Sequence, residues 1–528
     1  MGAHHNHAIQ DNPQFVFDGK LKMITLIMTL VGAVSLGVTY FTDGDYGHVR
    51  FWTNLLHNTA FFTGIAFASL FFLSTHVVAW GGWQTIFKRV PEAMMMFMPV
   101  GLIFFALIAV GVYMDAEGTD YLYLWSDETA LVDDHLVQHK SAFLNPFNYV
   151  LTLVVLGVWT FFAMMIRKLS LEQDGDRSLR KVNYEKIHMW SAIFLPIAGF
   201  SSAYAIWQWV MSVDVHWYST LFAWYATVSV WVSAICIIFL LILFLQGRGH
   251  MQYFTKEHTH DLGKYIFGFS VFWTYLWFSQ FLLIWYANNG EETQYFDLRF
   301  DQFPAVFYLN ILLNFILPFF ILMMNNSKRA KGTLALVAVI VLLGHWVDYF
   351  QMIKPGVWHN WEHAQHAGHG HGDDHGHGDE GHDAHGDLMH LNQAPKAVLT
   401  AQPQHGDDAH GEEGHAEEAP ATTENDSATA AETTAPAETA APETHAHDTE
   451  GHATAHGEEA HTEEGHAVHA TPFVMGIHFP GLLELGTMIG FLGLFLFVTF
   501  QVLSGASLMP KNDPYVDESK HHHVWYDL

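Results

Sequence analysis

Long apolar runs separated by short polar stretches set the pattern of this chain. Each run reaches about the ~20 residues that a helix needs to cross a hydrocarbon core of ~30 Å. Because lipid offers no water to backbone polar groups, only helices or closed barrels span it, and continuous runs of this length favour helices. The ten runs are 21–41, 57–80, 93–114, 147–166, 189–210, 217–245, 264–287, 303–324, 333–352 and 481–504. We therefore predict an all-α membrane protein with ten transmembrane helices.

A very short polar turn, residues 211–220, joins the fifth and sixth runs. Such a short connection predicts that the two helices are antiparallel neighbours. The turn also places Asp214 and His216 at the water–lipid boundary, where Trp217 and Tyr218 are typical anchors.

The composition supports a membrane protein. Hydrophobic residues make up 50% of the 528 residues and charged residues only 14%, against roughly 25% charged in an ordinary soluble domain. The net charge of −30 arises largely from one segment, since 24 of the 53 acidic residues lie between 361 and 470. It therefore indicates no nucleic-acid partner. The single cysteine, Cys236, rules out an intrachain disulfide, a CxxCH haem attachment and a cysteine-ligated iron–sulfur cluster.

The basic residues orient the ten predicted helices. Of the 23 lysines and arginines, 18 lie at the two termini or in and beside every second connection, which predicts that both termini are cytoplasmic. The other five are Arg50, Lys140, Arg299, Lys354 and Lys396. The first run has no obvious cleavage site and is interpreted as a retained helix. The predicted parts are a cytoplasmic segment 1–20, nine helices within 21–356, a periplasmic insert 357–475, the tenth helix within 476–506 and a cytoplasmic tail 507–528.

The predicted insert, 357–475, is rich in histidine, aspartate and glutamate and poor in aromatic and branched aliphatic residues. It cannot bury enough apolar surface to order itself, so we predict that it is disordered. Two interpretations fit: a solvated acidic tether, or weak binding of zinc, copper or nickel by neutral imidazoles. Glycine-spaced histidines define no fixed geometry, so no particular metal site is predicted.

Two ionisable residues in the ninth run are the first candidates for function. An ionisable side chain at membrane depth costs about 2.5–3.5 kcal/mol on insertion scales, so it needs a partner or a water path. His345 and Asp348 are three residues apart and share one helix face. A carboxylate that accepts a proton from imidazole orients the ring, as expected of a proton relay or quinol site. The alternative is a buried ion pair that only positions the helix.

The other histidines and the short turn leave similar alternatives open. Asp214 and His216 fit either a functional pair or an interfacial cap. His57 and His76 fit either a functional role or ordinary core histidines with satisfied hydrogen bonds. They lie 19 residues apart on one predicted helix, about ~28 Å. We predict no facing pair of histidines at mid-membrane depth, and therefore no b-type haem.

The seventh run and the short turn carry specific motifs. The stretch 273–288 reads WTYLWFSQFLLIWYAN and is followed by EET, and the turn contains DVHWYST at 214–220. These motifs resemble the NrfD/polysulfide-reductase-C (PsrC) family of integral membrane subunits. Within that family the chain is most similar to the second such subunit of alternative complex III, a bacterial quinol:cytochrome c oxidoreductase. The resemblance covers roughly residues 15–350 and the last helix.

The resemblance implies an architecture and a set of partners. Helices two to five and six to nine would form two four-helix bundles, flanked by the first and last helices, in the bacterial cytoplasmic membrane. The subunit itself would hold no covalently bound cofactor. Its partners would be c-type cytochrome subunits, an iron–sulfur subunit, a sister NrfD-like subunit and membrane lipid. The cytochrome subunits would hold haem c, and the iron–sulfur subunit would hold the iron–sulfur clusters. The substrate would be menaquinol or another quinol.

Quinol oxidation releases protons as well as electrons, so a dry bundle needs polar groups as a proton path. In the predicted proton path, His345 and Asp348 are the relay pair, and Asn310, Gln280 and Glu484 are their neighbours. Lys264 and His76 form the cytoplasmic half of the path. A quinone head group needs donors to its carbonyls and an acceptor for its hydroxyl proton. The predicted contacts to it are Asp214, His216 and His57. We predict no catalytic residue of the chain's own and no metal ligand.

Two functions of other classes compete with this prediction. A purely structural anchor of the same complex would need the buried charges only for assembly. A metal-ion transporter with a histidine-rich loop is the other, although the apolar runs contain no paired carboxylates or HExxH-like motif that would support it.

Overall fold

The computed structural model describes residues 14–369 and 473–523, and within these ranges all regular structure is helical. It contains ten helices long and apolar enough to cross a membrane, as predicted, and the chain is an all-α membrane protein. These spans are α1 (Gly19–Thr42), α2 (Val49–Val78), α3 to α4 (Arg89–Met94 and Met98–Tyr113, joined by η3, Met95–Phe97), α8 (Pro146–Gly175), α9 (Arg180–Trp209), α10 (Thr220–Gly247), α11 (Lys256–Ala287), α13 to α14 (Pro304–Ile311 and Leu317–Leu322, joined by η7, Leu312–Ile316), α16 (Lys331–His369) and α17 (Leu482–Ser504).

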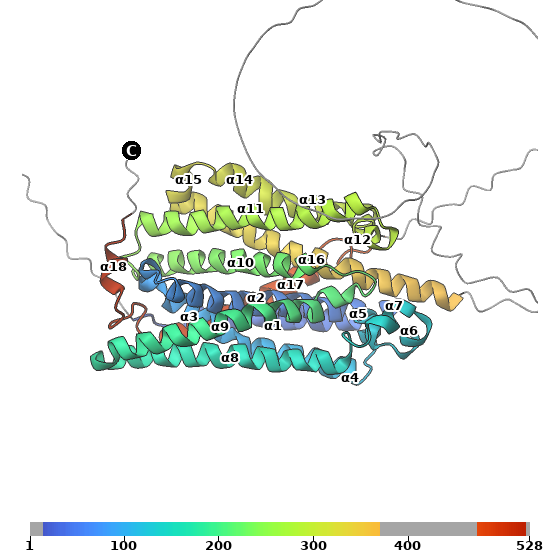
Figure 1. Ribbon diagram of the computed structural model, residues 1–528, viewed down its shortest axis with the longest axis horizontal. Helices are drawn as coiled ribbons and strands as arrows, with labels where there is room; N and C mark the ends of the chain where they lie inside the picture. The colour runs from blue at the N-terminus through green and yellow to red at the C-terminus, as the bar shows by residue number, and fades with distance from the viewer. Residues whose placement is uncertain (1–13, 370–472, 524–528) are drawn as a thin grey trace, which may run out of the picture. The chain divides into compact units, whose positions relative to one another are not determined.

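Short helices lie in the connections and mark the two ends of the helix bundle. They are η1 (Gly44–Tyr46), η2 (Gly82–Phe87), α5 (Thr119–Leu122), η4 (Leu124–Ser126), α6 (Glu128–Asp133), α7 (His135–Lys140), η5 (Arg177–Leu179), η6 (Met211–Val213), α12 (Gly290–Asp301), α15 (Asn325–Arg329) and α18 (Val516–Lys520). We call the end with η2, α15 and α18 the tail end, and the end with α5 to α7 and α12 the insert end (Figure 1).

Eight of the ten spans form two groups of four. In the first bundle, α2, α3–α4, α8 and α9 pack together, and in the second bundle α10, α11, α13–α14 and α16 do so. Helix α10 also packs against α2 and α9, and α16 against α2, so these helices form the interface between the bundles (Figure 1). The remaining two spans, α1 and α17, pack against each other and cross where a Cβ built on Gly32 would lie 2.4 Å from Gly490 Cα. Only glycine permits that approach.

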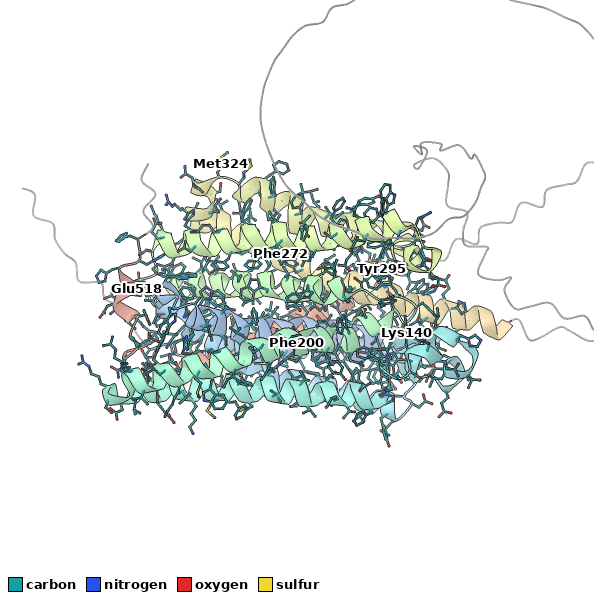
Figure 2. All side chains as sticks on the ribbon, viewed as in Figure 1. Lys140, Phe200, Phe272, Tyr295, Met324 and Glu518 are labelled. Atoms are coloured by element: carbon teal, nitrogen blue, oxygen red, sulfur yellow. The ribbon has the colours of Figure 1, made fainter. Side chains whose placement is uncertain are left out.

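The outward-facing side chains of the spans are apolar. Phe200 on α9 and Phe272 on α11, both labelled in Figure 2, have 83% and 41% of their surface exposed. Such a surface suits lipid, because lipid makes no hydrogen bonds to it.

Several helices extend beyond their apolar runs. Helix α2 starts at Val49 rather than at 57, α9 starts at Arg180 rather than at 189, and α16 continues to His369 rather than ending near 352. Hydropathy marks the part of a helix that suits lipid, whereas the backbone hydrogen bonds continue into polar sequence. Residues 357–369, predicted to open the disordered insert, are therefore helical, and most of the insert lies outside the described residues.

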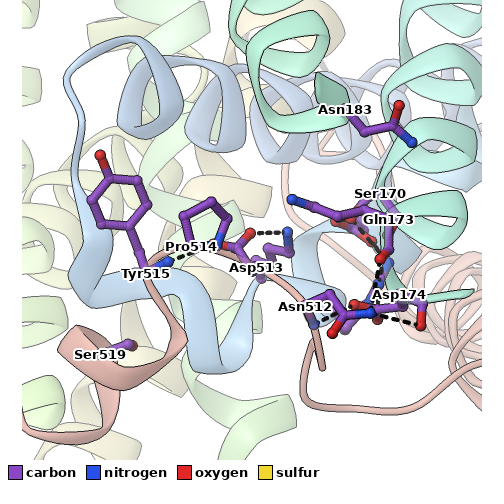
Figure 3. A network of polar contacts seen from close by, with 12 residues as sticks. Ser170, Gln173, Asp174, Asn183, Asn512, Asp513, Pro514, Tyr515 and Ser519 are labelled. Atoms are coloured by element: carbon purple, nitrogen blue, oxygen red, sulfur yellow. Dashed lines mark hydrogen bonds and ion pairs between the residues drawn. The ribbon is translucent and has the colours of Figure 1, made fainter. Parts of the chain in front are cut away.

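The tail, residues 507–523, crosses the helix ends of both bundles. Asn512 Nδ2 donates to Gln173 O at 3.1 Å, and Lys511 N donates to an oxygen of Asp174 at 2.9 Å (Figure 3). Asp513 pairs with Lys88, and Ser519 Oγ donates to Trp83 O at 2.6 Å. These contacts tie the last segment of the chain to the α2–α3 and α8–α9 connections.

Candidate functional site

The centre of the second bundle holds one buried carboxylate, Asp348 of α16, with no exposed surface. Each of the other three spans of the bundle donates a hydrogen bond to it. Trp273 Nε1 of α11 donates to Oδ2 at 2.9 Å, and Asn310 Nδ2 of α13 donates to Oδ1 at 2.8 Å. Tyr225 of α10 donates its phenolic hydrogen to Oδ1. All three donors are neutral, so the carboxylate is solvated by dipoles rather than by a cation.

His345 lies one turn from Asp348, as the spacing predicts, but it does not form the expected hydrogen bond. The distance from His345 Nδ1 to Asp348 Oδ2 is 3.9 Å, too long for one. Instead, Nδ1 lies 3.0 Å from Ser229 Oγ of α10, and the ring meets the Trp273 ring edge-on at 5.5 Å between centroids. The histidine is therefore positioned by its neighbours on α10 and α11.

Amide side chains extend the Asp348 network. Asn310 Nδ2 also lies 3.0 Å from Gln351 Oε1, and Asn314 Nδ2 donates to Asn310 Oδ1 at 2.5 Å. Asn314 lies in η7, a π-helical turn, a feature frequent at functional sites. It packs so closely on Gly344 that a Cβ there would lie 2.3 Å from Asn314 Oδ1. The sequence prediction that Asn310 neighbours Asp348 therefore agrees with the geometry.

A small cavity lies beside Tyr225 on the insert-end side of the network. Its lining residues are Tyr225, Trp277, Gln280, Tyr295, Phe296, Arg299, Gln351 and Met352. It has room for about one water molecule. Gln280, a predicted member of the proton path, contacts this cavity rather than Asp348, and its amide donates only weakly to Leu276 O at 3.4 Å.

Arg299 of α12 closes the far side of this cavity. It is 1% exposed and its Nη2 pairs with Asp214 Oδ2 at 3.0 Å. Its guanidinium lies over the Tyr295 ring, 3.3 Å from the centroid, and its Nε donates to Gln351 O at 3.3 Å. From the sequence, Arg299 is one of the charges expected in a connection. In the structure it links the network around Asp348 to the short turn that carries Asp214.

Asp214 and His216, expected to act together, have separate partners. Asp214 pairs with Arg299, whereas His216 Nε2 lies 2.5 Å from Asp134 Oδ2. Burial raises the pKa of the Asp134 carboxyl, but the hydrogen bond to His216 and backbone N–H groups outweigh it, so the pKa is lowered overall. The turn is thus held from two sides, by the ion pair of Asp214 with Arg299 and by the contact of His216 with Asp134.

Glu484 lies in a different cluster from Asp348, so the prediction that it neighbours the relay pair is wrong. Arg50 of α2 donates to both of its oxygens, at 2.7 and 2.9 Å. Asn54 Nδ2 and Gly481 N also donate to them, at 2.9 and 3.0 Å. Lys354 is buried nearby and donates to Thr53 Oγ1 at 3.0 Å. This cluster joins α17 to α2, and among the described residues Glu484 shares no hydrogen-bond partner with Asp348.

His57, the third predicted quinone contact, is fully buried at the interface between the bundles. Its Nε2 lies 2.8 Å from Trp346 O, and Trp346 Nε1 donates to Asn58 Oδ1 at 3.0 Å. The three predicted quinone contacts therefore have three different partners and do not form one hydrogen-bonded group.

Lys264 and His76, predicted for the other half of the path, lie near the tail end. Lys264 pairs with Asp261 at 2.6 Å, and Asp261 also lies 2.6 Å from His522 Nε2 of the tail. His76 Nε2 lies 3.1 Å from Tyr265 OH, on the turn next to Lys264.

Aromatic rings lie between the tail-end groups and the bundle centre. Tyr265 stacks on Phe269 with centroids 6.0 Å apart, and Trp231 contacts Phe269 at 5.5 Å and Phe72 at 6.0 Å. Among the described residues, no hydrogen bond joins His76 or Lys264 to Asp348. The two halves of the predicted path are thus unequal: one continuous in polar groups, one interrupted by aromatic rings.

A second set of buried charges lies at the tail end of the first bundle, and sequence reasoning missed it. Arg89 Nη1 pairs with Glu92 at 2.5 Å and its Nη2 with Asp174 at 2.5 Å, while Arg167 lies 3.6 Å from Glu92. Arg89 is 1% and Glu92 2% exposed. Their position next to an apolar run made them look like connection charges. Tyr225 and Trp273 were missed because aromatic residues in apolar runs are usually packing or belt residues.

Comparison of the chain with models of known protein families gives no match. Comparison with curated proteins likewise gives no match.

Proposed function

We propose that this chain is an NrfD-like integral membrane subunit of a respiratory quinol oxidoreductase of the alternative complex III type. Its own contribution is a proton path through the second bundle, with Asp348 as the group that binds the proton. The observation that carries the proposal is a fully buried carboxylate held by three neutral donors. Intramembrane carboxylates of this kind are typical of proton relays.

The neutral donors matter because they leave the proton affinity of Asp348 adjustable. A carboxylate in a tight ion pair must break that pair to take up a proton, since the cation would be left buried and unpaired. Tyrosine, tryptophan and asparagine side chains keep their charge of zero whether Asp348 is ionised or protonated. The same site can therefore hold both forms with a small rearrangement.

The proposed route runs from Asp348 toward the insert end. Tyr225 can pass a proton, because its hydroxyl is both donor and acceptor. The adjoining cavity has room for about one water, and Arg299 and Asp214 lie on its far side. In the proposed orientation the insert end is periplasmic and both termini are cytoplasmic, so protons from quinol would leave on the periplasmic side. The clustering of basic residues in alternate connections supports that orientation.

In the proposed complex, electrons travel through partner subunits. The iron–sulfur subunit and c-type cytochromes hold the clusters and haem c, and a sister NrfD-like subunit completes the membrane part. A quinone head group is larger than the cavity beside Tyr225, so this cavity suits water. Head-group contact would instead involve Asp214, His216 or His57, and each would first have to leave its present partner.

The test is purification of the tagged chain from its native membranes, followed by quinol oxidation and proton release in vesicles. We expect c-type haem to co-purify with the chain. We expect Asp348→Asn to assemble and to lose most proton release per electron, while Glu185→Gln, an exposed carboxylate at the tail end, behaves as wild type. Unchanged proton release in Asp348→Asn would refute the role of Asp348, and absence of haem would refute the complex.

A structural anchor is the second candidate, and a specific observation favours it. The Arg89–Glu92–Asp174 and Arg50–Glu484 clusters are ion pairs that join separate helices, and Asp174 also contacts the tail. If the chain only anchors the complex, Asp348→Asn reduces the amount of assembled complex without changing turnover or proton release per complex.

A further inference from the structure

The second bundle carries two successive layers of polar residues, each with one residue from every span. The layer around Asp348 consists of Tyr225, Trp273, Asn310 and Asp348. One turn toward the tail end lies a second layer, which consists of Ser229, Ser270, Asn314 and His345.

The spacing of these residues follows from helix direction. Helices α10 and α13–α14 run toward the tail end, so Tyr225 to Ser229 and Asn310 to Asn314 are steps of plus four. Helices α11 and α16 run the other way, so Trp273 to Ser270 and Asp348 to His345 are steps of minus three. Steps of three or four residues are one turn on the same face of a helix. The four pairs therefore define a second layer directly beneath the first.

The two layers differ in how well their polar atoms are satisfied. All four residues of the second layer are buried, with at most 2% exposed surface. In the described structure three of its atoms have no hydrogen-bond partner: Ser270 Oγ, Asn314 Oδ1 and His345 Nε2. These three atoms belong to three different spans. In the first layer, by contrast, both oxygens of Asp348 accept hydrogen bonds.

Three unbonded polar atoms in one buried layer are unusual, because proteins rarely leave such atoms without a partner. Internal water molecules commonly satisfy them, each making about three hydrogen bonds. The set here contains a hydroxyl, an amide oxygen and an imidazole nitrogen, which together offer both donors and acceptors. No carboxylate belongs to this layer, so its chemistry suits water better than a cation.

We propose that the layer of Ser229, Ser270, Asn314 and His345 is a binding site for internal water. The water lies between the Trp231–Phe269 rings and the Asp348 network, and it bonds the three atoms that lack partners. That this water also supplies protons to Asp348 through His345 rests on the proposed function. Occupancy of the layer by water does not.

The direct test is a density map of the full chain in its complex, at a resolution that shows ordered water. We expect a peak within hydrogen-bond distance of at least two of the three atoms, and its loss in Asn314→Leu, whose side chain fills the space without polar atoms. A well-defined empty layer would overturn the proposal. So would a peak whose height depends on sodium rather than choline in the buffer, since that identifies a cation.

A thermal unfolding experiment gives an independent reading. If the layer is dry, Ser270→Ala removes an unsatisfied hydroxyl and raises or leaves unchanged the Tm. If water is bound, the water loses a partner and the Tm falls. Ser69→Ala is the matched control, because Ser69 is equally buried but its hydroxyl donates to Ile65 O of its own helix at 2.8 Å. We expect Ser270→Ala to lower the Tm at least as much as Ser69→Ala, and a raised or unchanged Tm would contradict the proposal.

Proton release by the complex separates this inference from the proposed function. With both correct, Asn314→Leu loses the water peak and slows proton release while the complex still assembles. If the wild type shows the water peak and Asn314→Leu loses it without any change in proton release, the water site is confirmed. Its role in supplying protons to Asp348 is then refuted.

Discussion

Asp348 and Glu484 are both buried carboxylates toward the insert end, yet the structure surrounds them in opposite ways. Among the residues that the structure describes, Glu484 accepts two hydrogen bonds from the Arg50 guanidinium, whereas Asp348 accepts hydrogen bonds only from neutral groups, on Tyr225, Trp273 and Asn310. An ion pair fixes the charge on a carboxylate, because removing it leaves a buried cation. Neutral donors stabilise the charge without fixing it. The comparison teaches that partners, rather than depth, distinguish an anchoring carboxylate from one that can exchange a proton.

Breaking the anchoring pair should give the largest effect. Arg50→Ala leaves Glu484 buried without its cation, and removing one partner of a buried pair costs about 3–5 kcal/mol. We expect a large fall in Tm and in the yield of folded protein. The double variant Arg50→Ala with Glu484→Leu should recover part of this loss, because the carboxylate that lost Arg50 is gone, whereas the Lys354 cation stays buried nearby. Lys181→Ala, at an exposed pair with Glu185, is the control and should change the Tm little.

Removing the charge of Asp348 should destabilise the protein less. Asp348→Asn keeps the shape of the side chain and one oxygen acceptor. It replaces the other oxygen by an NH2 group that faces a hydrogen-bond donor, which costs about 1–3 kcal/mol. We expect a smaller fall in Tm than for Arg50→Ala, together with a loss of proton release. If Asp348→Asn were as destabilising as Arg50→Ala, Asp348 would belong with the anchors.

Removing a single neutral donor should be milder still. Tyr225→Phe deletes the hydroxyl that donates to Asp348 and lines the cavity, at about 0.5–1.5 kcal/mol for the hydrogen bond. We expect slower proton release with a nearly unchanged Tm. Tyr349→Phe is a control at the residue that follows Asp348 on α16, since the Tyr349 hydroxyl donates to Ala226 O instead. Equal rates in the two variants would remove Tyr225 from the route.

The smallest expected effect concerns Asp43, which lies outside the spans near the Glu484 cluster. Burial raises the pKa of its carboxyl, although the backbone N–H of Phe51 donates to it. A carboxyl whose pKa is higher in the folded state than in the unfolded state stabilises the fold in its protonated form. This stabilisation is complete below the unfolded-state pKa of about 3.9 and is lost as the pH rises through the folded-state pKa. Asp43→Asn should therefore raise the Tm slightly at neutral pH, with the advantage disappearing toward acid pH. A Tm difference independent of pH would contradict this assignment.

Much of the fold follows from the sequence. The apolar runs predict all ten spans, because the length of a run is a direct consequence of the lipid thickness. Helix ends are predicted less well, and α16 runs seventeen residues past position 352 to His369. Backbone hydrogen bonds do not stop where the side chains become polar.

The site is only partly predictable, since sequence gives depth and spacing but not the neighbours of a helix. His345 and Asp348 share a face because they are three residues apart on one helix. Nothing in the sequence tells whether Glu484 faces α2 or the second bundle. In the structure it faces Arg50 of α2, so its assignment to the Asp348 network is wrong. Arg299 is hidden among connection charges for the same reason, and only packing reveals that it is buried against Asp214.

The most direct test of the central claim is infrared spectroscopy of the carboxyl groups in the membrane-embedded complex, recorded across a pH titration and compared with Asp348→Asn. A buried protonated carboxyl gives a band separate from that of the carboxylate. We predict a band that appears and disappears reversibly in the wild-type protein and is missing in Asp348→Asn, while Glu484→Gln leaves it in place. An Asp348 carboxylate that stays ionised at every pH at which the protein remains folded would contradict the account.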